Sequence, residues 1–235
     1  MGNNCCGSKK PPYVNINIAT LGDSLTDSGY YGKVMDYSSN LINWYQYFMY
    51  QQLKTRNIES SILDLGVGGQ VISQICNRIL SASPSTYITI MAGTNDILSA
   101  DFSDPNVNEN LAAHIISIYK QKIPEVILYQ NVTFGYSPIV IICTIPPVGD
   151  GPSVLPLGRI TEAINFVNCE LKKFAENNPD VLLCDTNRSL KGINDRFIRG
   201  LCVEDNIHFT ETGKLVCGQT IANSIIEHYY KWNEK

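Results

Sequence analysis

The sequence predicts an α/β fold built around a parallel sheet, and two features of its patterning indicate this class. Five short apolar runs have the character of buried strands, and segments whose apolar residues recur at helical spacing lie between them. Strands that alternate with helices form parallel sheets covered on both faces. We therefore expect a three-layer α/β/α sandwich with a five-stranded parallel sheet.

The predicted strands show either β-type alternation or a short continuous apolar run. In the first strand, asparagines separate Val14, Ile16 and Ile18, which is the period of a strand. The fourth strand is the longest apolar stretch of the chain and ends at two prolines. The five predicted strands cover residues 14–21, 62–66, 87–93, 139–145 and 181–184.

The predicted helices rest on apolar residues spaced by three and four. The clearest runs from Ile160 to Phe174 and keeps the rhythm of an amphipathic helix. In the last helix, Ile221, Ile225 and Tyr229 are spaced by four. Besides the helix at 160–174, helices are predicted over residues 41–53, 71–79, 111–122 and 212–230, with loops at 101–110 and 146–156.

Composition and charge exclude several classes of protein. A chain of 235 residues with 44% hydrophobic residues can form one large domain, which we expect over residues 13–235 after a polar tail at 1–12. The formal net charge is −4 and basic residues form no block, so we expect no nucleic-acid partner. No run approaches the ~20 apolar residues that a membrane span needs.

The cysteine pattern predicts a protein without a zinc site. None of the six cysteines beyond the N-terminal pair belongs to a C-x-x-C motif. Cys143 and Cys184 lie inside predicted strands, where a free cysteine behaves as a small buried hydrophobe. The first residues are polar and lack the apolar segment of a secretory signal, so we expect a reducing, intracellular location.

The residues that follow the predicted strands carry the strongest signal, because ligands of such sheets bind beyond the carboxyl ends of the strands. Gly-Asp-Ser-Leu occupies 22–25, Gly-Val-Gly-Gly 66–69, Gly-Thr-Asn-Asp 93–96, and Asp-Asn-Ile-His 205–208. In this order and spacing the chain resembles the GDSL, or SGNH, hydrolase superfamily of esterases and lipases. The resemblance runs from Leu21 to Gly213 and implies a flavodoxin-like sandwich.

The chemistry of these residue types agrees with the resemblance. A serine hydroxyl is a poor nucleophile unless a base accepts its proton, and His208 can take that role for Ser24. Asp205 lies three residues before His208, so one turn can present both side chains and the carboxylate can orient the imidazole. The resemblance assigns the oxyanion hole to the backbone N–H groups of Ser24 and Gly69 and the side-chain amide of Asn95.

One position departs from the family pattern. The second block often opens with Asn five residues before its functional glycine, and Asp64 stands there in this chain. We expect the change to affect loop hydrogen bonds rather than the chemistry. Asp23, Asp27 and Asp96 are interpreted as residues of loop geometry, because no histidine or further carboxylate joins them in a metal-binding pattern.

The sequence thus predicts a serine esterase or lipase that forms an acyl-enzyme on Ser24 and needs no metal or cofactor. Its expected partner is a small-molecule or lipid ester. An O-acyltransferase with the same residues, and a non-catalytic binding module of the same fold, are the alternatives. Simpler interpretations exist for single residues, since Ser24 or Asn95 could cap a helix and the glycines could only make turns. The compound pattern favours the catalytic interpretation.

The N-terminus suggests a lipid anchor. Gly2 follows the initiator methionine, as N-myristoylation requires, and Cys5 and Cys6 are candidates for palmitoylation. Two such signals together give stable attachment, whereas one acyl chain binds only marginally. Cys6 stands where the myristoylation pattern usually has Ser or Thr. We expect the protein in the cytoplasm, or at a membrane if this tail is acylated. The alternative for the tail is a polar segment without a role.

Overall fold

A computed structural model of the chain describes residues 15–35, 44–151 and 156–233. Its centre is a five-stranded sheet in the order β2-β1-β3-β4-β5, and all neighbouring strands are parallel. This is the flavodoxin-like order, so the predicted fold class is confirmed. The strands are β1 (Asn15–Gly22), β2 (Glu59–Gly66), β3 (Tyr87–Met91), β4 (Ile139–Cys143) and β5 (Val181–Cys184).

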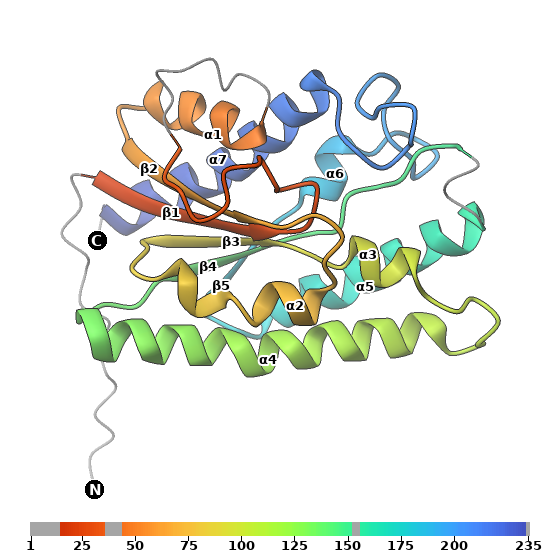
Figure 1. The fold of residues 1–235 in the computed structure, drawn as a ribbon, viewed down its shortest axis with the longest axis horizontal. Coiled ribbons are helices and arrows are strands. Elements are labelled where there is room, and N and C mark those ends of the chain that lie inside the picture. Colours follow the sequence, from red (N-terminus) through yellow and green to blue (C-terminus); the bar gives the residue numbers. More distant parts are fainter. Residues whose placement is uncertain (1–14, 36–43, 152–155, 234–235) are drawn as a thin grey trace, which may run out of the picture.

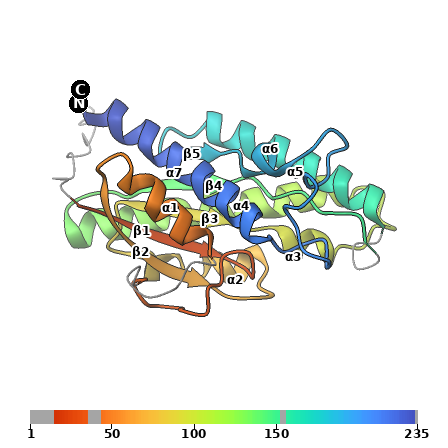
Figure 2. The same ribbon diagram turned by 90° about the horizontal axis from the view of Figure 1, so that it is seen from above.

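Helices cover both faces of the sheet. Figure 1 shows α1 (Tyr45–Lys54) and α7 (Glu211–Asn233) on one face, and α2 (Ile72–Cys76), α4 (Val107–Phe134) and α5 (Leu157–Glu176) on the other. Seen from above, α1 and α7 lie over the sheet side by side (Figure 2). Two short helices, α3 (Thr94–Leu98) and α6 (Thr186–Leu190), follow β3 and β5, and a 3₁₀ helix (Ile79–Ala82) precedes β3.

The alternation of side chains along the strands divides the core into two layers. In β1, Ile16 and Ile18 pack with α1 and α7, while Ala19 and Leu21 belong to the cluster under α2, α4 and α5. The other inner strands divide in the same way, and their residues are almost wholly buried. Because both faces of the sheet are covered, β3 and β4 are nearly continuous apolar runs, and this is why short apolar stretches predicted them.

Two predicted helices have different bounds in the structure. The helix expected at 111–122 extends from Val107 to Phe134 and continues through Pro124. A proline inside a helix costs about 3 kcal/mol, but the buried stripe of this helix, which includes Tyr119, Ile123 and Val126, continues past it. Burial of that stripe outweighs the local cost.

The segment predicted as one helix over 71–79 is broken in two. It forms α2, which ends at Cys76, and the 3₁₀ helix from Ile79 to Ala82. At the break the N–H of Arg78 donates to Ile75 O, a tighter bond than that of an α-helix. The apolar spacing was therefore correct as a burial pattern but wrong as evidence for one continuous helix.

The lipidation candidates Gly2, Cys5 and Cys6 lie outside the described residues. Within the described ranges, no helix combines the length and apolar character that crossing a bilayer requires.

Candidate active site

The segments singled out in the sequence meet at the carboxyl edge of the sheet. Ser24 follows β1, Gly69 follows β2, and Asn95 lies in α3 directly after β3. Asp205 and His208 lie in the connection between α6 and α7. In chain order Ser24 and His208 are 184 residues apart, yet the fold brings their side chains into contact.

Ser24, His208 and Asp205 form a chain of short hydrogen bonds. The distance from Ser24 Oγ to His208 Nε2 is 2.8 Å, and that from His208 Nδ1 to Asp205 Oδ2 is 2.6 Å. A carboxylate only accepts hydrogen bonds, so Nδ1 carries the ring hydrogen and Nε2 is free to accept from Ser24. The three side chains thus have the order and contacts of a catalytic triad.

The base turn, residues 203–208, is closed by its own aspartate. Asp205 Oδ1 accepts from the backbone N–H groups of Ile207 and His208, both at 2.9 Å. Partial burial acts to raise the pKa of Asp205, but these bonds and the His208 ring outweigh it and hold that pKa below its usual value. Asp205 is therefore ionised over the pH range in which a histidine titrates.

The nucleophile turn, residues 23–28, is held from within by Asp23. The Asp23 side chain accepts from the N–H of Leu25 at 2.9 Å, and its carbonyl accepts from the N–H groups of Thr26 and Asp27. Asp23 is only 1% exposed, and this burial raises its pKa to about 6. The turn leaves Ser24 partly exposed, although the residues on both sides of it are buried.

The predicted oxyanion donors lie around the loop of residues 66–70. A Cβ placed on Gly68 would be 3.7 Å from Ser24 Cβ, so this loop lies against Ser24. On the other side, the side-chain amide of Asn95 donates to Gln70 O over 3.0 Å. Gly69 lies between these contacts with φ of +78°, a conformation that favours glycine. The structure thus brings Ser24, Gly69 and Asn95 together.

Asp64 joins the nucleophile turn to this loop. One of its oxygens accepts from the N–H of Gly66 at 2.8 Å, and the other accepts from the N–H of Ser28 at 3.0 Å and from the Ser28 hydroxyl. Burial raises the pKa of the Asp64 carboxyl. Two oxygens that only accept suit these donors, so the departure from Asn does act on loop hydrogen bonds, as expected.

The other acidic residues near Ser24 also bond to loop backbone. Asp27 accepts from the N–H groups of Gly29 and Gly68, and Asp96 accepts from the N–H of Ile72. Their interpretation as residues of loop geometry is confirmed. Across residues 15–35, 44–151 and 156–233, no three His, Cys, Asp or Glu side chains are grouped closely enough to hold a metal ion.

The role of Arg78 was not predicted from the sequence. Its guanidinium donates to Leu65 O at 2.8 Å, to Gln74 O at 2.9 Å and to the Gln70 side chain. It thereby ties the end of β2 to the last residue of the 66–70 loop. An arginine in a predicted helix carries no signal for the contact with Leu65, because this carbonyl becomes its neighbour only in the fold.

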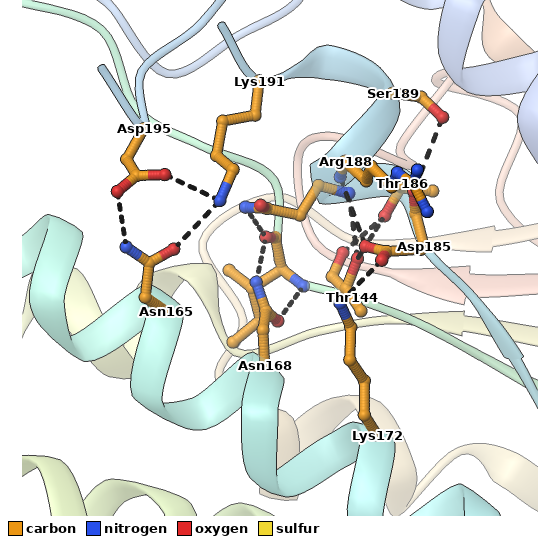
Figure 3. A network of polar contacts seen from close by, with 12 residues as sticks. Thr144, Asn165, Asn168, Lys172, Asp185, Thr186, Arg188, Ser189, Lys191 and Asp195 are labelled. Atoms are coloured by element: carbon orange, nitrogen blue, oxygen red, sulfur yellow. Dashed lines mark hydrogen bonds and ion pairs between the residues drawn. The ribbon is translucent and has the colours of Figure 1, made fainter. Parts of the chain in front are cut away.

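A polar network anchors the start of the long segment that leads to the base turn. Figure 3 shows Asp185, directly after β5, bonded to Lys172 at 2.7 Å and to the Thr144 hydroxyl at 3.0 Å. A few residues further, Lys191 pairs with Asp195 at 2.7 Å. These contacts connect α5, the ends of β4 and β5, and the chain that continues to Asp205.

A hydrogen-bonded Ser–His–Asp chain at the carboxyl edge of a parallel α/β sheet is an arrangement found in the class of serine hydrolases. Sequence comparison gives the particular family: the chain belongs to the GDSL-like lipase/acylhydrolase family, whose model matches residues 20–215. The family resemblance seen in the sequence is thereby confirmed. A search of curated proteins found no match.

Solved structures share the fold at low sequence identity. A carbohydrate acetylesterase from Sinorhizobium meliloti is 16% identical, with a TM-score of 0.65 over 90% of this chain and 99% of its own. A lipase from a goat rumen metagenome is 18% identical, with a TM-score of 0.67 over 89% and 97%. An acetylxylan esterase from Geobacillus stearothermophilus is 16% identical, with a TM-score of 0.63 over 89% and 94%.

Proposed function

We propose that this protein is a carboxylic ester hydrolase that works through an acyl-enzyme on Ser24. The observation that carries the proposal is the continuous hydrogen-bond chain from Ser24 Oγ through His208 to Asp205, with bonds of 2.8 and 2.6 Å. Family membership supports acylhydrolase chemistry in general. It does not by itself select the serine or the substrate.

In the first half of the reaction, Ser24 Oγ attacks the carbonyl carbon of the ester and its proton passes to His208 Nε2. The ionised Asp205 stabilises the imidazolium that forms. The tetrahedral intermediate then collapses: the bond from carbon to the alcohol oxygen breaks, and His208 returns the proton to the departing alkoxide. The products of this half are the free alcohol and an acyl ester of Ser24.

In the second half, a water molecule gives its proton to His208 Nε2 and attacks the acyl carbon. The bond to Ser24 Oγ breaks, the proton returns to this oxygen, and the carboxylic acid leaves. Both tetrahedral intermediates carry an oxyanion, for which we propose the N–H groups of Ser24 and Gly69 and the amide of Asn95 as donors. Such donors stabilise the negative charge because they are already directed at the point where it develops.

The structural neighbours support this reaction without fixing the substrate. They include esterases of acetylated carbohydrates and a lipase. For the acetylxylan esterase, a serine and a histidine variant are each described as catalytic mutants, which are the residue types of Ser24 and His208. We propose an ester of a small acid or a lipid as the substrate class.

A hydrolysis assay with aryl acetates and longer acyl esters tests the proposal. We expect wild-type protein to release the alcohol and Ser24→Ala to release none above background. Mass spectrometry of the wild type trapped with an organophosphonate should place the adduct on Ser24. Hydrolysis that persists in Ser24→Ala would refute the mechanism. Added acceptor alcohols should not replace water, and an acylated alcohol as the main product would indicate an acyltransferase.

We also propose that acylation of Gly2, together with Cys5 or Cys6, attaches the protein to membranes in cells that have the acylating enzymes. Its support is the sequence pattern alone. Fractionation of cells expressing the wild type, Gly2→Ala, and the double variant Cys5→Ser/Cys6→Ser tests it. If the wild type stays in the soluble fraction like both variants, the anchor is refuted and the esterase proposal is unaffected.

A further inference from the structure

The base turn packs against a loop from a distant part of the chain. This loop, residues 148–151, follows β4 and is here called the glycine loop. The N–H of Gly149 donates to Asn206 O over 2.8 Å. Asn206 lies between Asp205 and His208, so the glycine loop contacts the centre of the segment that carries the proposed base.

Two glycines leave the space that the Asn206 side chain fills. A Cβ placed on Gly149 would lie 2.5 Å from Asn206 Oδ1, and one on Gly151 would lie 2.0 Å from Asn206 Nδ2. At both positions the three nearest atoms all belong to the Asn206 side chain. The glycine loop therefore lies directly against this side chain, and a Cβ at either glycine would clash with it.

Asn206 also determines the shape of its own turn. Its φ is +66°, in the left-handed region that Asn tolerates better than most residues. Its backbone N–H donates to Val203 O at 2.9 Å, and its side-chain amide donates to Glu204 O at 2.8 Å. The same side chain thus closes the base turn and fills the glycine loop.

Hydrogen bonds hold the backbone just before the glycine loop. Asn168 on α5 makes a two-way bond with the backbone of Ile145, accepting from its N–H at 2.7 Å and donating to its carbonyl at 2.9 Å. Asn187 donates to the same carbonyl at 2.8 Å. Figure 3 shows Asn168 reaching from α5 to this backbone. These bonds fix the backbone at Ile145, four residues before Gly149.

We propose that Asn206 and the glycine loop position His208 Nε2 against Ser24 Oγ. Asn206 is a positioning residue, because it acts on His208 through the backbone of the base turn. The inference rests on the proposed function. A displacement of about 1 Å at a reacting group can cost about 100-fold in rate. A substitution that displaces Asn206 should therefore lower kcat.

The test compares four proteins with the wild type: Gly149→Ala, Asn206→Gly, the double variant Gly149→Ala/Asn206→Gly, and Gly158→Ala. Gly149→Ala should lower kcat for an aryl ester about 10- to 100-fold with little change in KM. The double variant should recover to within about threefold of Asn206→Gly, because glycine at 206 accepts positive φ and removes the three atoms nearest to the new methyl group. Gly158→Ala, with open space around it, is the matched control and should keep wild-type kcat.

Thermal unfolding of each variant shows that it is folded, and Gly151→Ala replaces Gly149→Ala if the latter does not fold. Wild-type kcat in a folded Gly149→Ala, or a double variant no faster than Gly149→Ala alone, would overturn the positioning role. A wild type without Ser24-dependent hydrolysis would instead refute the proposed function.

Discussion

The two halves of the candidate site are held in different ways. The nucleophile turn is enclosed by the sheet: Asp23, Leu25, Thr26 and Ser28 around Ser24 are each 5% exposed or less. The base turn lies at the surface, and the side chains of His208 and Asp205 are 43% and 42% exposed. The nucleophile turn is held mainly by burial. The base turn is held by local hydrogen bonds and by the close contact of Asn206 with the glycine loop.

This difference separates stability from activity. Changes around Ser24 disturb packed strand ends and buried carboxylates, so they should alter the free energy of unfolding as well as the rate. Changes in the base turn affect few buried contacts, so they should alter the rate with little loss of stability. The predictions that follow test this separation, from the largest expected effect to the smallest.

The largest effect is expected for the two proposed reacting residues, Ser24 and His208. Ser24→Ala and His208→Ala should each lower kcat about 10⁴- to 10⁶-fold, and the double variant should be no slower, because the two residues act as one unit. Stopped assays with a fluorogenic ester, alongside thermal unfolding, measure both properties. Losses that multiply in the double variant would show that the two residues act independently.

Loss of one proposed oxyanion donor should have a smaller effect. Asn95→Ala removes the amide that bonds Gln70 O, and we expect kcat to fall about 10²- to 10³-fold. The expected change in KM is small, because the oxyanion is absent from the bound ester and forms only as Ser24 attacks. A variant that raises KM and leaves kcat intact would indicate that Asn95 binds substrate instead.

Gly66→Ala should reveal the rigidity of the nucleophile half. A Cβ at this position would lie 2.3 Å from the backbone nitrogen of Asp27, which cannot move aside as a side chain can. We expect the free energy of unfolding to fall by about 1–3 kcal/mol or more in urea denaturation. If Gly66→Ala is as stable as Gly158→Ala, the nucleophile half is more adaptable than its burial implies.

The smallest effect is a pH dependence of stability that arises from Asp23. Its pKa is about 6 in the folded protein against an ordinary 3.8, so the folded state binds the proton more tightly than the unfolded state does. This contribution to stability is therefore present below pH 4 and is lost as the pH rises through about 6. Asp23→Asn should be more stable than the wild type at pH 8, by on the order of 1–3 kcal/mol.

The measurement for this last prediction is the free energy of unfolding of the wild type and of Asp23→Asn, each at pH 4 and at pH 8. The difference between the two proteins is compared across pH, because Asp64 and Asp96 also have raised pKa values and remain in both. The advantage of Asp23→Asn should disappear near pH 4. An advantage of equal size at both pH values would mean that its cause is packing and not charge.

Sequence alone determined the fold class, because strands covered on both faces are continuous apolar runs and helices repeat at their own period. It also determined which residue types stand at the strand ends, since the four blocks of the family are local patterns. The bounds of α4 and the break after α2 could not be predicted this way. Apolar spacing reports burial, and burial is compatible with a proline in a helix or with a 3₁₀ turn.

Only the tertiary structure decided which distant groups meet. The contact of His208 with Ser24 was inferred from family blocks, but its distance depends on a loop between α6 and α7 that no periodicity describes. The bonds of Arg78 to Leu65 and the fit of Asn206 between two glycines have no local signature at all. Such contacts depend on how loops from separate elements converge, and a local pattern records the conformation of one segment and not its neighbours in space.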